Sequence, residues 1–403
     1  MKIAEINMVD YGSTGNIMFQ IADCALKNGY EVKSFSKKWK KQSLKREYHF
    51  FYGTTLENGI HVILSKLIGF QGLFSYFGTK QLIRELDKFK PDIIHLHNLH
   101  DSSTCLPILF KYVKKKNIPV IWTLHDCWTM TGQCPHFSMI KCDKWKNGCF
   151  KCPQLHNLLK NFIDCSRYMW NKKKEWFSGI ENITIVTPSR WLAQIVKESY
   201  LKKYSVKIIN NGIDTTIFSP RKSDFKEKNK IKDKYIVLGV AFGWGEKKGL
   251  DVFQKLSKRL NEKYVIVMVG TNETIDKTLS EKIISIHCTQ NQKEIAEIYS
   301  TADVFVNPTR EDTFPTTNIE ALACGTPVIT YKTGGSPEIL NEQCGVVVEV
   351  DDIDNLEKNI INICENKIYS EKECIKRASQ FNKEEKFKEY IKLYKEIYKK
   401  EKY

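Results

Sequence analysis

The chain has 403 residues, 42% of them hydrophobic, and a formal net charge of +16. This composition excludes a disordered chain, and the length predicts two or three domains. No run of 18 apolar residues occurs, so the sequence predicts no membrane-spanning helix. Residues 1–7 form too short an apolar stretch for a signal peptide and predict a strand. Thirteen cysteines without a secretion signal favour reduced thiols or metal ligands over disulfides.

Short apolar runs alternate along the chain with stretches that are compatible with helices. The runs occupy residues 1–7, 93–96, 120–122, 183–186, 237–240, 265–269, 304–306 and 328–330. This alternation predicts an α/β protein whose parallel sheets are covered by helices on both faces. Residues 219–230 are polar and charge-dense, which predicts a loop. The tail carries a helical apolar stripe, namely Phe387, Tyr390, Ile391, Tyr394 and Ile397.

The positive charge suits nucleic acid, anionic lipid or phosphorylated substrates, with codon bias as the alternative explanation. Basic clusters at residues 37–41 and 114–116 would be attracted to an anionic membrane surface. A basic, zinc-containing nucleic-acid binder is disfavoured, because the lysines are spread along the whole chain rather than clustered.

Ligands of open parallel sheets bind at the carboxyl ends of the strands, and the first half of the chain has polar residues there. Residues 12–15 (Gly-Ser-Thr-Gly) follow the first strand and allow a ligand close to the backbone. His95 and His97 belong to the run after residue 92, and alternation predicts that they share one face. His125 and Asp126 follow the next strand. Hydrogen-bonded core histidines and a metal site both remain open interpretations.

The second half of the chain places two carboxylates eight positions apart, at Asp312 and Glu320. Asp312 follows a predicted strand, and Thr316 or Thr317 is expected to cap a helix that contains Glu320 and ends before Gly325. Carboxylates accept bonds from sugar hydroxyls, and the N–H groups at a helix start bind phosphate. The pattern therefore indicates a ligand with both groups.

Four cysteines fall within nineteen residues of one another: Cys134, Cys142, Cys149 and Cys152. The two-residue gap of the last pair suits a tetrahedral ion. The segment is polar and predicts little core of its own, so a metal would explain its order. Structural zinc, reduced thiols packed as small hydrophobes, and disulfides remain as alternatives.

The motifs together resemble those of the family 4 retaining glycosyltransferases, in particular the subgroup of colanic acid and capsule synthesis. The matching segments are residues 12–17, 122–126, 187–191, 211–214, 248–249, 312–327 and 334–338. Two departures stand out. The first acid is normally Glu but is Asp312 here, with Glu311 beside it, and the usual phosphate-binding Arg is replaced near Phe242, with Lys247 as the candidate substitute.

This resemblance implies the GT-B fold, in which two Rossmann-like doubly wound domains face each other across a cleft. The first domain would span residues 1–205 and include a Cys-rich insertion at 130–155. The nucleotide-sugar domain would span 206–380. A helix over 381–403 would pack back on the first domain, with membrane contact as the alternative role for its apolar stripe.

The resemblance also implies retaining transfer of a sugar from a UDP- or GDP-sugar to a polysaccharide or lipid-linked oligosaccharide, in the synthesis of capsule, exopolysaccharide or O-antigen. Such enzymes are cytoplasmic and peripheral at the inner face of the bacterial plasma membrane. A nucleotide-sugar epimerase or a phosphorylase is the alternative enzyme of the same fold.

The resemblance further implies a role for each matched residue. Glu320 would hold the ribose, and Asp312 or Glu311 the sugar hydroxyls. His125 would contact the donor sugar. Gly15, Lys247, Lys248 and the segment Phe314, Pro315, Thr316, Thr317 would bind the diphosphate. No protein nucleophile and no catalytic metal are expected.

Overall fold

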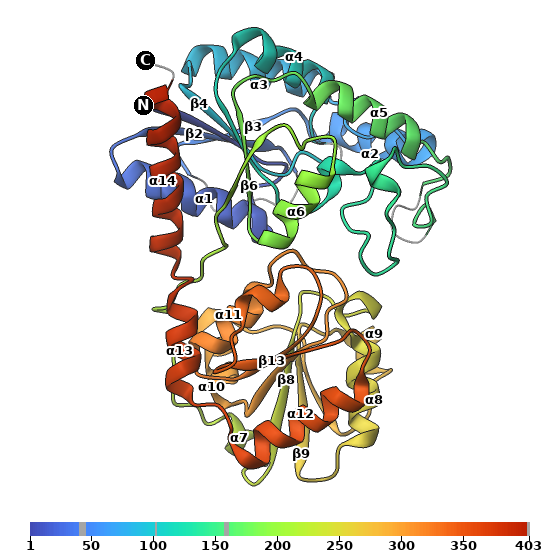
Figure 1. Ribbon diagram of the computed structural model, residues 1–403, viewed down its shortest axis with the longest axis vertical. Helices are drawn as coiled ribbons and strands as arrows, with labels where there is room; N and C mark the ends of the chain where they lie inside the picture. The colour runs from blue at the N-terminus through green and yellow to red at the C-terminus, as the bar shows by residue number, and fades with distance from the viewer. Residues whose placement is uncertain (40–45, 101–102, 157–160, 401–403) are drawn as a thin grey trace. The chain divides into compact units, whose positions relative to one another are not determined.

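The computed structural model describes residues 1–39, 46–100, 103–156 and 161–400. The chain divides into two compact units (Figure 1). Unit 1 comprises Met1–Ile209 and Phe387–Tyr403, and unit 2 comprises Asn210–Lys386. The division thus follows Ile209, a few residues beyond the position expected from the sequence. Each unit is a parallel α/β domain, as the alternating pattern predicts.

Unit 1 is built on a sheet of seven strands in the order β3-β2-β1-β4-β5-β6-β7, with all neighbours parallel. The strands are β1 (Lys2–Ile6), β2 (Glu31–Lys37), β3 (His49–Tyr52), β4 (Ile93–Leu96), β5 (Val120–Thr123), β6 (Ile183–Thr187) and β7 (Ser205–Ile208). The helices are α1 (Gly12–Lys27), α2 (Thr55–Ile68), α3 (Tyr76–Phe89), α4 (Leu106–Lys116), η1 (Trp128–Met130), η2 (Lys144–Lys146), α5 (Ser166–Phe177), α6 (Arg190–Glu198) and α14 (Lys383–Lys400).

The C-terminal helix α14 packs on the same apolar cluster as α1, and Figure 1 shows the two helices side by side. The predicted stripe is its buried face, with Phe387, Tyr390, Ile391 and Tyr394 each at most 3% exposed. Burial of large aromatic and aliphatic side chains is the main attraction between such elements. The stripe is therefore a packing surface of unit 1 rather than a membrane-facing one.

Unit 2 is built on six parallel strands in the order β10-β9-β8-β11-β12-β13. They are β8 (Tyr235–Val240), β9 (Tyr264–Val269), β10 (Ile283–Ile286), β11 (Val304–Asn307), β12 (Val328–Tyr331) and β13 (Gly345–Val348). The helices are α7 (Phe225–Lys228), η3 (Glu246–Lys248), α8 (Leu250–Arg259), α9 (Glu273–Asp276), α10 (Gln292–Thr301), α11 (Thr316–Ala323), η4 (Ser336–Ile339), α12 (Ile353–Asn366) and α13 (Glu371–Ser379). Two apolar clusters form its core.

The strand order reverses direction once in each sheet, between β1 and β4 in unit 1 and between β8 and β11 in unit 2. At such a switch point the loops after the two central strands diverge to opposite faces and leave a crevice for a ligand. The fold thus marks one candidate position in each unit.

Several local expectations from the sequence are wrong. The expected loop at 219–230 contains α7, and residues 12–15 form the first turn of α1. Pro315, not a threonine, is the N-cap of α11. Lys37 is fully buried and so cannot serve a membrane surface, while residues 40–41 lie outside the described chain. Over the described segments, no helix is both long and apolar enough to cross a membrane.

Candidate active site

Two lysine–carboxylate pairs lie at the switch point of unit 2. Lys248, in η3 after β8, has its Nζ 2.8 Å from Oδ2 of Asp312, which follows β11. Lys247 Nζ lies 3.5 Å from Oε2 of Glu311. Glu311 is 6% exposed at its side chain, whereas Asp312 is 21% exposed. Asp312 is therefore the more accessible of the two acids to a ligand.

Gly249 allows the loop with the two lysines to approach the loop after β11. Its φ is +77°, in the left-handed region that favours glycine. A Cβ at this position would lie 2.6 Å from Cγ of Pro308, which directly follows β11. The glycine of the Lys-Gly sequence motif is thus explained by this close contact. Phe242, which stands near the position of the missing arginine, is fully exposed at the carboxyl end of β8.

Helix α11 begins at Thr316 and directs its first N–H groups toward this loop region. The sequence predicts that amides from Phe314 to Thr317 bind phosphate. The Phe314 N–H instead donates to Oδ1 of Asp312 at 3.2 Å. This bond orients the carboxylate and engages one of the N–H groups that were expected to bind phosphate.

Glu320 lies in the second turn of α11 and has an unusual environment. The hydroxyl of Tyr299, in α10, donates to its Oε2 at 3.2 Å. Burial raises the pKa of Glu320 to about 7, and the bonds from Tyr299 and Thr316 only partly oppose this. The carboxyl therefore changes charge near neutral pH, a property that is common at functional sites.

Arg310 is a structural residue of the site that the sequence did not reveal. Its guanidinium pairs with both oxygens of Asp251 in α8, at 2.8 and 2.9 Å, and with Asp351 after β13 at 2.6 Å. These hydrogen bonds raise its pKa further. Arg310, Asp251 and Asp351 lie on three separate segments of the chain, so no local sequence pattern predicts that they meet. Arg310 joins the segments next to β11 and β13 to α8.

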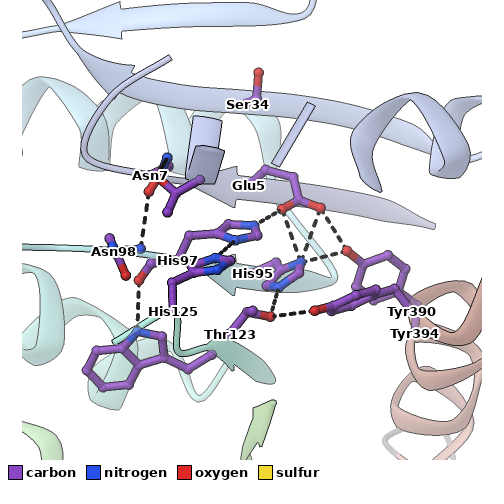
Figure 2. Close-up of polar contacts among 12 residues, drawn as sticks. Glu5, Asn7, Ser34, His95, His97, Asn98, Thr123, His125, Tyr390 and Tyr394 are labelled. Carbon is purple, nitrogen blue, oxygen red and sulfur yellow. Dashed lines mark hydrogen bonds and ion pairs between the residues drawn. The ribbon is translucent and has the colours of Figure 1, made fainter. Parts of the chain in front are cut away.

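The switch point of unit 1 holds a buried polar cluster (Figure 2). Glu5, in β1, accepts bonds from His97 Nε2 at 2.9 Å and from His95 Nδ1 at 3.0 Å. The hydroxyl of Tyr394, in α14, donates to the other carboxylate oxygen at 2.7 Å. His97 Nδ1 lies 3.1 Å from Nε2 of His125, after β5. His95 and His97 share one face, as predicted.

The charges of this cluster follow from its burial. Burial alone would raise the pKa of Glu5, but the bonds and charges of His95 and His97 outweigh it and lower the pKa to about 2. Burial lowers the pKa of His97 to about 4 and that of His125 to about 3. In the described part of the chain, Glu5, His95 and His97 form the set of three metal-ligating atoms within 4.8 Å of one another. Their nitrogens and oxygens already bond to each other, to Tyr394, to Thr123 and to His125.

Glu5 is not predicted as a site residue from the sequence, although an acidic residue inside a mainly apolar first strand could have indicated it. Gly15 also has a structural explanation. A Cβ there would lie 2.7 Å from the backbone carbon of Asp10, so the chain's own turn before α1 requires glycine.

The Cys-rich segment has more core than its polarity suggests. Phe137 and Trp145 are buried in the main apolar cluster of unit 1 and stack with centroids 5.0 Å apart. Trp170 donates to the Trp145 carbonyl at 2.8 Å. The expectation of a segment with little core of its own is therefore wrong, and metal is not needed to explain its order.

The four cysteines of this segment are free thiols and neighbours of one another. Cys134 and Cys152 share a hydrogen bond. Cys149 lies close enough to Cys142 and Cys152 for their charges to affect the pKa of the Cys149 thiol. The Gly132 N–H donates to Sγ of Cys149 at 3.2 Å. Within the described residues, however, no three of the sulfur atoms lie within 4.8 Å of one another.

Comparisons with known proteins agree with the geometry. The pattern of "Glycosyltransferase Family 4" matches residues 14–217, just over half of the chain, and that of "Glycosyl transferases group 1" matches residues 221–393. The chain belongs to glycosyltransferase family 4. Together the two matches cover the switch point of unit 2 in this family 4 protein and, at the switch point of unit 1, β4 but not β1.

Two relatives of known name are similar to this chain at about 25% sequence identity. The putative colanic acid biosynthesis glycosyl transferase WcaC of Escherichia coli K12 is 24% identical over 278 residues, which are 65% of each chain. A UDP-Gal:alpha-D-GlcNAc-diphosphoundecaprenol alpha-1,3-galactosyltransferase of Escherichia coli is 26% identical over 192 residues, or 43% of this chain and 49% of that protein. The family 4 protein thus spans about half to two thirds of the length of these relatives.

Solved structures share the fold at low identity. Sucrose-phosphate synthase from Thermosynechococcus elongatus has a TM-score of 0.73 at 16% identity, covering 98% of this chain and 99% of that one. The Anabaena protein HepE in complex with UDP has a TM-score of 0.70 at 13% identity, covering 98% and 100%. These likenesses show the GT-B fold of the family 4 protein.

Proposed function

We propose that this protein is a retaining glycosyltransferase that uses a UDP- or GDP-sugar as donor. One observation carries the proposal: at the switch point of unit 2, Lys248 and Asp312 pair directly, and Glu320 stands in the helix that follows. Cations for phosphate, an accessible acid for sugar hydroxyls and a second acid for ribose are the groups that such a donor needs.

The lysines would act on the leaving group. Sugar transfer passes through an oxocarbenium-like state while negative charge develops on the departing diphosphate. Preorganised cations at that position stabilise the charge at little reorganisation cost. Lys248 and Lys247 are held in place by Asp312 and Glu311 before the donor binds. When the diphosphate binds, the Lys248 ammonium would interact with both the diphosphate and Asp312. The Asp312 oxygens would then also accept hydrogen bonds from the sugar hydroxyls.

We propose a polysaccharide or lipid-linked oligosaccharide as acceptor, for capsule, exopolysaccharide or O-antigen synthesis at the inner face of a bacterial plasma membrane. The galactosyltransferase relative, whose name includes a diphosphoundecaprenol-linked sugar, supports this class. Helix α2 of unit 1 exposes four apolar side chains, Leu56, Ile60, Ile63 and Leu67, on a chain of net charge +16. An exposed apolar helix face on a basic protein suits the surface of an anionic bilayer.

We also propose one structural zinc per chain in the Cys-rich segment, with no part in the chemistry. The mutual contacts of Cys134, Cys149 and Cys152 and the N–H bond to Cys149 support it. Lys173 also supports the zinc proposal. Its buried ammonium donates to the carbonyls of Trp128 and Gly132 and lies near the thiols of Cys134 and Cys149. Zinc-bound thiolates would supply negative charge beside it. The sulfur atoms would have to draw closer on binding the ion.

The test is a thermal-shift screen of UDP- and GDP-sugars, since a ligand that binds only the folded state raises the melting temperature. Glu320→Ala should weaken binding of the donor found in the screen. Asp312→Asn should lower turnover more than it lowers donor affinity. Full activity of both folded variants would refute the site, and damage confined to Glu311→Gln would move the sugar-contacting acid by one residue. Turnover of the donor without any acceptor would instead support an epimerase.

A further inference from the structure

Phe242 is the most exposed large apolar side chain among the described residues. Its ring is fully exposed, and the next in order, Phe77, is 78% exposed. Single apolar side chains are common on protein surfaces, so exposure by itself carries no conclusion. The position of Phe242 adds to it, because the residue lies two positions after the end of β8, the strand whose carboxyl end borders the switch point of unit 2.

The backbone on both sides of Phe242 is fixed to the end of β9. The Ala241 N–H donates to the carbonyl oxygen of Val269, the last residue of β9, at 3.1 Å. The indole N–H of Trp244 donates to the same oxygen at 3.0 Å, and its ring packs edge-on against Phe253 of α8 with the centroids 5.2 Å apart. Phe242 stands between these two anchors, so its exposure belongs to a loop that the fold holds in place.

The loop that carries Phe242 leads directly to the charged groups of the site. Gly243 has a φ of +85°, and a Cβ at Gly243 or at Gly245 would meet no atom within 4 Å, so the space beside the loop is open. The Gly245 carbonyl accepts a hydrogen bond from the N–H of Lys248 at 3.0 Å, and the Lys248 ammonium pairs with Asp312 at 2.8 Å. An aromatic ring, an ammonium and a carboxylate thus belong to neighbouring segments at one edge of the sheet.

We propose that Phe242 binds a pyranose ring by stacking on the C–H face of the sugar. The inference rests on the proposed function, which places a sugar beside Lys248 and Asp312. The hydroxyls at the edge of a pyranose need hydrogen-bond partners such as Asp312, whereas the C–H groups of its face are apolar and pack on an aromatic ring. Because the loop already holds the Phe242 ring in place, little further ordering is needed when the sugar covers it.

The nucleobase of the donor is the other flat group that an aromatic side chain could cover. Glu320, the acid expected at the ribose, lies in α11 and bonds to Tyr299 of α10. Phe242 instead shares its loop with the lysines expected at the diphosphate, which favours the sugar over the base. Both the donor and the acceptor present a pyranose at the point of transfer, and the experiment separates these two sources.

Four variants isolate the contact. Phe242→Tyr keeps the aromatic face, Phe242→Leu keeps an apolar side chain without a flat ring, and Phe242→Ala removes the contact. Phe77→Leu is the matched control, because Phe77 is an exposed phenylalanine of α3 in unit 1. Since neither ring is buried, all four variants should keep the melting temperature of the wild type.

The donor is tested by calorimetry with UDP, with GDP and with the nucleotide-sugar found in the thermal-shift screen. If Phe242 covers the donor sugar, Phe242→Ala and Phe242→Leu should lower the affinity for the nucleotide-sugar about tenfold, the value of one aromatic stacking contact. Their affinity for the nucleoside diphosphate should not change. Phe242→Tyr and Phe77→Leu should keep both affinities.

The acceptor is tested by saturation-transfer difference NMR with the methyl pyranosides of glucose, galactose and N-acetylglucosamine, in the presence of the nucleoside diphosphate. If Phe242 covers the acceptor sugar, saturation should reach the C–H protons of one pyranose face in the wild type and in Phe242→Tyr. It should be lost in Phe242→Ala and Phe242→Leu, while Phe77→Leu should behave as the wild type.

Four outcomes would overturn the proposal. They are sugar binding that Phe242→Ala leaves unchanged in both measurements, an equal loss of affinity for the nucleoside diphosphate and the nucleotide-sugar, a Phe242→Leu variant that binds sugar as well as Phe242→Tyr, and a lower melting temperature of Phe242→Ala. Both measurements follow binding, so they report on Phe242 even if the protein proves not to transfer a sugar. Sugar transfer by a protein in which Phe242→Ala changes nothing would refute this inference alone.

Discussion

Glu320 provides the sharpest test, because its pKa of about 7 makes both stability and donor binding depend on pH. The ordinary value is 4.5, so the folded protein retains a proton that the unfolded chain releases. Stability should therefore fall as the pH rises from about 4.5 to about 7 and level off above. At 1.36 kcal/mol per pH unit, this single group contributes a decrease of about 3 kcal/mol.

Glu320→Gln keeps the shape of the side chain and removes the titration. Urea unfolding at pH 5 and pH 8 should therefore show a smaller pH-dependent decrease in the variant, by about 2.5 kcal/mol, since part of the titration lies below pH 5. Lys173 and Cys152, whose pKa values are also near 7, contribute equally to both proteins and cancel in the comparison. An identical decrease in both proteins would refute the buried, protonated state of Glu320.

Donor binding should show the opposite trend with pH. Ribose hydroxyls donate to the ionised carboxylate, so a nucleotide-sugar selects the form that is only a minority at pH 6. With a free pKa of about 7, the affinity should rise about tenfold between pH 6 and pH 8. Isothermal titration calorimetry should find this rise in the wild type and none in Glu320→Gln. Tyr299→Phe removes a bond that lowers the pKa and should move the rise to higher pH. A rise that persists in Glu320→Gln would assign the titration to another group.

Four further predictions concern separate parts of the molecule. Lys248→Ala should lower single-turnover rates by about 10²–10³ and Lys247→Ala by less; equally small losses would leave the diphosphate to backbone amides alone. Cys149→Ser should lose both one zinc per chain, measured by elemental analysis, and thermal stability; a metal-free wild type with freely titrating thiols would contradict the zinc site. Arg310→Ala removes the hydrogen bonds to Asp251 and Asp351, whose side chains are 34% and 56% exposed, and should cost about 1–2 kcal/mol in urea unfolding; an unchanged free energy of unfolding would show the network to be dispensable. Ile63→Glu should weaken sedimentation with anionic vesicles, and salt should weaken it further; binding that ignores both changes would exclude α2 as the contact.

The alternation of apolar runs determined the fold class, because a strand buried on both faces must be apolar throughout and leaves a readable signal. The runs at 93–96, 237–240 and 304–306 lie in β4, β8 and β11. The motif residues of unit 2 were also accessible from the sequence, since they lie in the loops and helices that come next after β8 and β11. The apolar stripe of the tail likewise predicted a packed helix, but it did not identify the surface on which this helix packs.

Tertiary structure alone decided which distant residues meet. Arg310 with Asp251 and Asp351, and Glu5 with Tyr394, are pairs separated by tens to hundreds of positions, and their contact depends on strand order rather than on spacing. The charge states of buried groups likewise depend on the tertiary structure. Glu320 is a carboxyl of ordinary appearance in the sequence, and only the burial around it raises its pKa into the neutral range. Periodicity and spacing act along the chain, whereas desolvation and ion pairing depend on what the fold places within a few ångströms.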